Sequence, residues 1–221
     1  MNETRERWGS ICSAFRFPTS SLGMLDDLIA MYGDQQRYYH NWKHVEACLK
    51  KLESYSYDRI ENYTPPAFGR LEYMRAAYAL IMHDAVYDTR SPRNEENSAF
   101  LASALAGSTF ANDLILGTKK HKLSKDNTQN VVNDIDMSIL GSPKLEYQGY
   151  IGNIRQEHCF ISNEGFAHGR AEWVQSTLAS PIFHTSYYFD KYEDQARKNL
   201  KLELFNMGID YVAPKEPSRF Y

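Results

Sequence analysis

The chain has few cysteines, and none of them are spaced for pairing. Cys12, Cys48 and Cys159 are the only three in 221 residues, and no CxxC motif is present. This argues against a zinc ribbon and against a disulfide framework, and it suits a reducing compartment. The first residues, MNETRERWGS, lack the basic segment followed by an apolar segment that is typical of a signal peptide. We therefore expect a cytoplasmic protein.

Long hydrophobic runs and a strong excess of one charge are also missing. AAYALIM at 76–82 is among the longest apolar runs, far short of the roughly 20 residues that span a bilayer. The formal net charge is -3, which argues against a protein that binds a nucleic-acid backbone. We expect neither a membrane nor a nucleic-acid polymer as partner. The oligomeric state stays open, a homodimer included.

Strand signals are absent, whereas helical periodicity covers most of the chain. No segment alternates with period two, and no Asn-Gly or Asp-Gly turn is found. Pro65-Pro66 is expected to break the chain. We predict an all-α, single-domain protein of nine or ten helices. The expected helices cover about 3–16, 20–35, 39–55, 68–87, 94–106, 109–122, 128–140, 144–160, 164–179 and 187–207.

The segment RYYHNWKHV at 37–45 contains His40 and His44, four positions apart. On a helix these side chains share a face, with Cβ atoms about 5–6 Å apart. If the helix begins after Tyr39, His40 lies in the preceding loop, and the two side chains can still converge. The spacing alone does not distinguish a metal-binding pair from a polar patch.

Two later segments place histidine and aspartate among apolar residues. ALIMHDAVYD at 79–88 contains His83 and Asp84, and NDIDMSILG at 133–141 contains Asp134 and Asp136. Buried imidazole and carboxylate groups are costly unless something satisfies them. A divalent cation would do so, and this donor set suits manganese, iron, cobalt, nickel or zinc. Each feature alone is better explained by a helix cap or a surface acid, but their order and their apolar settings together predict a metal site.

The ordered set of H, HD and D resembles the HD superfamily of metal-dependent phosphohydrolases, which are all-helical. The segments YHNWKHV, MHDAVYD, NEENSA, TKKH, DIDMSILG and IRQEH look like a bacterial subgroup of predicted metal-dependent HD phosphohydrolases. The resemblance implies one HD-type helical bundle over 1–221. Its metal-binding core would cover about 37–160, with the C-terminal helices of 163–207 packed on it.

The resemblance also implies hydrolysis of a phosphate ester or anhydride, in a nucleotide or similar small phosphorylated molecule. It assigns the metal ligands as His44, His83, Asp84 and Asp136, with Asp136 preferred over Asp134. The metal would be manganese, nickel, cobalt, iron, magnesium or zinc. Such an ion lowers the pKa of bound water and polarises a phosphoryl oxygen.

YHNWKH is also similar to the YHNxxH segment of cyclic nucleotide phosphodiesterases. In that segment the second histidine binds metal and the first donates a proton to the leaving oxygen. By this resemblance His40 is the general acid and His44 a ligand. We therefore expect His40 and Asp84 to be the catalytic residues.

Further polar residues are candidates for contact with substrate. Lys119, Lys120 and His121 in TKKH, and Arg155 in IRQEH, are candidate phosphate contacts. His121 is also a candidate ligand of a second metal. The alternative for TKKH is helix termination by cations, and the alternative for Arg155 is a partnership with His158.

Glu95 in NEENSA and Asp134 are candidates to orient a ligand histidine by hydrogen bonding. Stabilisation of a helix N-terminus is the alternative for Glu95.

Two other functions stay open. A dinuclear iron oxygenase needs extra histidines between the HD pair and the last aspartate, where His121 stands alone. A non-catalytic ligand-binding HD domain is the other, and the presence of all expected ligands counts against it.

Overall fold

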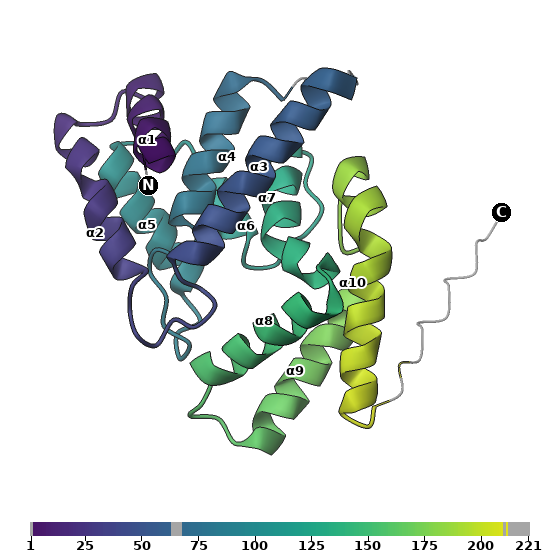
Figure 1. Cartoon of the computed structure of the whole chain (residues 1–221). Helices are drawn as coiled ribbons and strands as arrows, with labels where there is room; N and C mark the ends of the chain where they lie inside the picture. Colours follow the sequence, from purple (N-terminus) through teal and green to yellow (C-terminus); the bar gives the residue numbers. More distant parts are fainter. Residues whose placement is uncertain (1, 63–67, 210, 212–221) are drawn as a thin grey trace. The chain divides into compact units, whose positions relative to one another are not determined.

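The computed structural model describes residues 2–62, 68–209 and 211. This part of the chain forms ten α-helices and two short 3₁₀ helices, and it contains no strand (Figure 1). The predicted all-α fold is confirmed. Within the same residues, no helix combines the length and the apolar composition needed to cross a membrane. Pro65 and Pro66, the expected chain break, lie outside the described residues.

By its internal contacts the chain divides into two compact units, Met1–Asp136 and Met137–Tyr221. The metal-ligand candidates from His44 to Asp136 all belong to the first unit. The single domain inferred from the sequence stays a prediction.

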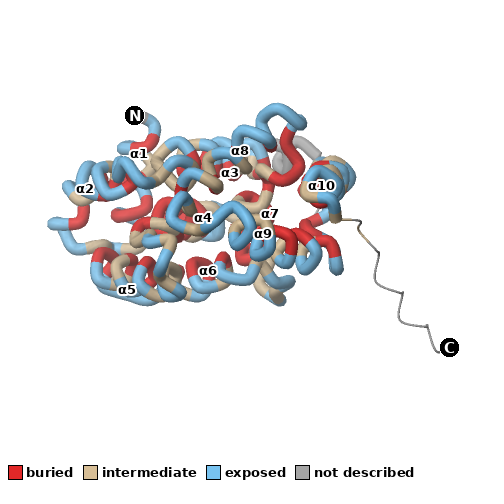
Figure 2. The backbone as a smooth tube through the Cα atoms, turned by 90° about the horizontal axis from the view of Figure 1, so that it is seen from below, coloured by how far each residue is buried: buried red, intermediate tan, exposed pale blue. Residues whose placement is uncertain are grey.

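The first unit is built around the C-terminal half of α4 (Arg70–Met82), which is buried on all sides. Every residue of α4 from Ala76 to Met82 is buried, as expected for a helix that is apolar all round. It packs against α1, α3, α5 and α6 (Figure 1). By contrast, α2 buries only Leu25 and Leu28 and exposes most of its other residues (Figure 2). The elements of this unit are α1 (Asn2–Ala14), η1 (Thr19–Gly23), α2 (Met24–Met31), α3 (Trp42–Asn62), α4 (Arg70–Met82), α5 (Asn94–Ala106), α6 (Asn112–Gly117) and α7 (Asn127–Met137), the last ending one residue past the boundary.

Two helix boundaries differ from the sequence prediction in ways that bear on function. The helix expected from residue 39 begins at Trp42, because the Asn41 side chain accepts a hydrogen bond from the Lys43 amide at 2.9 Å. This is the usual geometry of an N-cap, and it leaves His40 in the loop before α3. The helix expected to reach residue 87 ends at Met82, so that His83 and Asp84 follow its last turn.

The second unit consists of η2 (Ser138–Gly141), α8 (Lys144–Glu157), α9 (Asn163–Leu178) and α10 (Ser186–Asn206). Helix α10 packs on η2, and the Asn199 amide donates to the carbonyls of Leu140 and Ser142 at 2.8 Å each. A buried ion pair joins Arg170 to Glu203, with Nε to Oε1 at 2.8 Å. These polar contacts stay satisfied inside an otherwise apolar core, which is the condition for burying them.

Candidate metal centre

Three helix ends bring the predicted ligands together in the first unit. His44 lies on the first turn of α3, His83 and Asp84 directly follow α4, and Asp136 lies on the last turn of α7. Helix ends suit this purpose because each chain segment changes direction there and can present a side chain along the helix axis.

The side-chain atoms of these four residues converge. The His44 Nε2 atom lies 3.2 Å from His83 Nε2 and 3.1 Å from Asp136 Oδ1. The His83 Nε2 atom lies 3.0 Å from Asp84 Oδ2 and 3.4 Å from Asp136 Oδ1. Two donors that bind one cation at about 2.1 Å and about 90–110° are about 3.0–3.4 Å apart. These four distances fit a shared divalent ion, whereas His44 Nε2 and Asp84 Oδ2 lie farther apart, at 3.9 Å.

The electrostatics of the cluster are those of a site that attracts cations. Burial disfavours the charged form of His83, but Asp84 and Asp136 outweigh it and hold the pKa of His83 well above its ordinary value. Burial alone would raise the pKa of each carboxyl. The charge of His83 instead lowers the pKa of both Asp84 and Asp136, and His40 contributes further at Asp84. In the metal-free protein a proton on His83 thus provides the positive charge that a metal ion would provide.

One ring nitrogen of His83 is occupied, which leaves the other for a metal. Its Nδ1 lies 3.0 Å from the Leu80 carbonyl oxygen, and only a protonated Nδ1 can donate to that oxygen. The Nε2 atom then faces the carboxylates. A backbone carbonyl that fixes the ring in this way is a common support for a metal-binding histidine.

His121 adds a third imidazole beside the cluster. Its Nε2 lies 2.8 Å from Asp136 Oδ2, while Asp136 Oδ1 faces His44 and His83. The Asp136 carboxylate is therefore shared between the two sides. His121 also has a φ of 45°, a left-handed conformation that costs a non-glycine residue about 1–3 kcal/mol.

His40 lies in the loop before α3, close to the cluster but half-buried. Its ring stacks on Tyr87 with centroids 4.4 Å apart and lies 6.0 Å from the ring of His44. Tyr39 contacts both histidine rings, with centroid distances of 5.0 Å to His40 and 4.8 Å to His44. The aromatic contacts hold the ring of His40 at the edge of the site.

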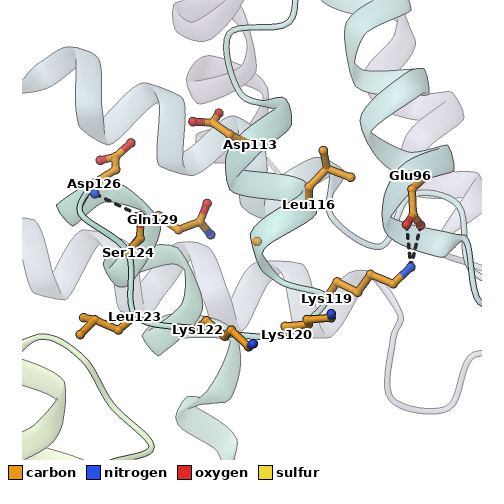
Figure 3. A pocket seen from close by; sticks show the side chains of 11 residues that line it. Glu96, Asp113, Leu116, Lys119, Lys120, Lys122, Leu123, Ser124, Asp126 and Gln129 are labelled. Carbon is orange, nitrogen blue, oxygen red and sulfur yellow. Dashed lines mark hydrogen bonds and ion pairs between the residues drawn. The ribbon is translucent and has the colours of Figure 1, made fainter.

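The structure places Lys119 against acidic residues of α5. Its Nζ lies 2.7 Å from Glu96 Oε1 and 3.5 Å from Glu95 Oε2. Glu95, expected to orient a ligand histidine, thus contacts a lysine. Lys120 lies with Lys119 and Lys122 along one edge of a pocket of about 480 Å³ (Figure 3).

Arg155 and Asp134 are the two remaining predicted residues. Arg155 belongs to the second unit and donates to the carbonyls of His158 and Ile161 at 2.8 and 3.0 Å. This is the partnership with His158 that the sequence left as an alternative. Asp134 is fully buried on α7, and among the described residues it belongs to neither group that could hold a metal ion.

Sequence reasoning missed two residues that the structure brings to the site. Cys48 lies one turn after His44, with Sγ 3.7 Å from Nε2, and it forms a possible ligand group with His44 and Asp136. Burial, followed by the charges of Asp136 and Asp84, raises the pKa of the Cys48 thiol. The i, i+4 spacing of KHVEAC was the available signal. The second residue, Arg37, binds the backbone at Asp84.

Comparison with protein-family models, with curated proteins and with solved structures finds no match. The centre is therefore interpreted from its own donor set, burial and charge. In the part of the chain that the structure describes, two groups could hold a metal ion, His44 with His83 and Asp84, and His44 with Cys48 and Asp136.

Proposed function

We propose that the chain is a divalent-metal-dependent phosphohydrolase that cleaves a phosphate ester or anhydride in a small molecule. One observation carries the proposal: two imidazoles and two carboxylates from three distant segments converge, with each histidine Nε2 within 3.4 Å of Asp136 Oδ1. The resemblance of the H, HD, D order to HD phosphohydrolases supports the same reading. In this proposal His44, His83, Asp84 and Asp136 hold the ion.

The ion, when bound, supplies an activated water and polarises the phosphoryl oxygen. The chain's own residues supply position and protons. His40, at the edge of the cluster, donates a proton to the departing oxygen, a role that suits an imidazole near neutral pH. The Leu80 carbonyl keeps the proton of neutral His83 on Nδ1, so that Nε2 stays directed at the site.

Lys120 and Lys122 support the substrate side of the proposal. They flank His121, whose ring reaches Asp136. Among the described residues neither lysine takes part in an ion pair, whereas Lys119 is neutralised by Glu96. The charges of Lys120 and Lys122 are therefore available to an anionic part of a substrate. We expect these two lysines to contribute more to phosphate binding than Lys119.

A dinuclear iron oxygenase is the second candidate, and the contact of His121 with Asp136 favours it. A carboxylate with one oxygen on each side can join two metal ions. An oxygen-consumption assay on iron-loaded protein separates the candidates. Uptake of oxygen without release of phosphate would replace the hydrolase with the oxygenase.

The proposal is tested by screening purified protein against a library of phosphate esters and anhydrides, with manganese, nickel, cobalt, magnesium or zinc supplied. Asp84→Ala serves as the blank. Asp26→Ala, which removes an exposed carboxylate paired with Arg5, serves as the matched control. We expect metal-dependent phosphate release in the native protein and in Asp26→Ala, and neither bound metal nor release in Asp84→Ala. Full metal content in Asp84→Ala, or no release from any compound, would overturn the proposal.

A further inference from the structure

Arg37 joins two segments that carry predicted site residues. Its Nη1 donates to the Asp84 carbonyl at 2.6 Å, and its Nη2 donates to the Ala85 carbonyl at 3.0 Å. The same Nη1 lies 3.4 Å from the carbonyl oxygen of His40. One guanidinium group therefore contacts the backbone of the proposed general acid and that of Asp84, a proposed metal ligand 47 positions after Arg37.

Aromatic rings fix the plane of this guanidinium. Its central carbon lies 5.0 Å from the ring centroid of Tyr32 and 5.5 Å from that of Tyr87. Tyr87 also stacks on the ring of His40 at 4.4 Å. Arg37 thus reaches His40 by two routes, through the backbone carbonyl and through the shared tyrosine.

The loop that holds His40 is tied at its other end as well. The Asn41 side chain donates to the carbonyls of Tyr38 and Arg37, at 2.9 and 3.3 Å, and it caps α3. The loop of residues 37–41 is therefore anchored to α3 by Asn41 and to the end of α4 by Arg37. A cation at the C-terminal end of α4 also interacts favourably with the helix dipole.

We infer that Arg37 is a positioning residue that fixes the ring of His40 relative to the His83–Asp84 segment. The expected effect on turnover rests on the proposed function, whereas the position of the His40 ring does not. The planar fork of arginine bonds two neighbouring carbonyls and stacks on rings, whereas the ammonium of lysine does neither equally well. Arg37→Lys keeps the positive charge, but we expect it to lose the fixed position of the His40 ring.

The test begins with the ring protons of His40 in NMR spectra of the zinc-loaded protein. Stacking on Tyr87 shifts these protons upfield in the native chain. We expect the upfield shift to be lost in Arg37→Met and in Arg37→Lys, with metal content unchanged. The indole N–H signal of Trp8, which is buried in the first unit and donates to the Ser21 carbonyl at 3.0 Å, reports whether each variant stays folded.

Arg197→Met is the matched control. Arg197 likewise donates to two carbonyls at a helix end, those of Leu178 and Ser180 at 3.0 and 2.6 Å, and it also pairs with Glu193 at 2.7 Å. Its loss removes the same kind of bonds without touching the loop of residues 37–41. The control should keep the native signals of His40 and the native kcat.

Turnover completes the test. A displacement of about 1 Å in a catalytic group costs up to about 100-fold in rate. We therefore expect kcat to fall roughly 10- to 100-fold in both Arg37 variants, with KM changed much less. Native His40 signals in the folded variants would overturn the inference, and so would lost His40 signals with native kcat. If the native protein releases no phosphate, the proposed function fails, while the His40 signals still decide whether Arg37 fixes the ring.

Discussion

Metal binding should release a proton from the centre, and the structure gives its source. In the metal-free protein the pKa of His83 lies well above its ordinary value of 6.5 against the burial that opposes it, because Asp84 and Asp136 stabilise the charged ring. The pKa of each carboxyl is lowered, so both are already ionised at neutral pH. A cation can bind Nε2 of His83 only after that nitrogen loses its proton.

The magnitude follows from this single proton. Below the raised pKa of His83, each unit of pH should increase the apparent metal affinity about tenfold, or about 1.4 kcal/mol. Between pH 6 and pH 7 we therefore expect about a tenfold gain in affinity. The gain should level off once the pH passes the raised pKa, because His83 is then neutral before the metal arrives.

Calorimetry in buffers of different ionisation enthalpy measures the number of protons released. We expect close to one proton at pH 6–7. A native protein that releases no proton in this range, with affinity independent of pH, would refute the reasoning about His83.

The same pKa predicts how stability depends on pH. His83 has a raised pKa in the folded state, so its contribution to metal-free stability is fully present below pH 6.5 and is lost as the pH rises through the folded-state value. The carboxylates behave in the opposite sense. Their pKa values are lowered, so their contribution is present above pH 3.8 and is lost on acidification. In thermal unfolding, the Tm of the metal-free protein should therefore fall as the pH rises through the folded-state pKa of His83. It should also fall when the protein is acidified below pH 3.8.

Three further predictions concern single residues. His40→Ala should keep its metal, measured by elemental analysis, while kcat falls roughly 10²- to 10⁴-fold; loss of metal would make His40 a ligand instead. Asp136→Asn should weaken metal binding by more than the roughly 10- to 100-fold that follows loss of a supporting group. Asp134→Asn should leave metal affinity unchanged. Equal effects of the two substitutions in a metal titration would contradict the choice of Asp136 as the ligand. Lys120→Gln should raise KM by about threefold to tenfold, as for one exposed charge-assisted contact. Lys119→Gln should change KM less, because Lys119 already pairs with an acid. A larger rise in KM for Lys119→Gln than for Lys120→Gln in steady-state kinetics would exclude the proposed phosphate contact.

His83 and Asp84 could be predicted from a local signal in the sequence. They end an apolar stretch of helical periodicity, and such an interruption indicates a buried polar group that needs a partner. His44 has no such signal, and only the resemblance assigned it as a ligand. The choice between Asp134 and Asp136 could not follow from the same signal. Successive residues on a helix are rotated by about 100°, so these two point to nearly opposite sides, and both lie among apolar neighbours.

The roles of charged residues were harder to predict from the sequence, because their partners are distant along the chain. Lys119 pairs with Glu96 across 23 positions, and Arg37 binds the Asp84 carbonyl across 47. Periodicity and caps describe what a helix does, and they contain no information about which surface charges meet. The position of His40 in a loop was predicted only as an alternative, because the helix was expected from residue 39. The Asn41 cap starts the helix at Trp42 and leaves His40 before it.

At His121 the left-handed backbone lowers stability, while the side chain contacts the candidate metal centre. Glycine adopts a φ of 45° without the cost that a side chain incurs. A His121→Gly protein should therefore resist unfolding better at that turn, yet it would lose the imidazole that contacts Asp136. A search for thermostable variants would be drawn to this substitution, and it would remove one of the three imidazoles gathered at the centre.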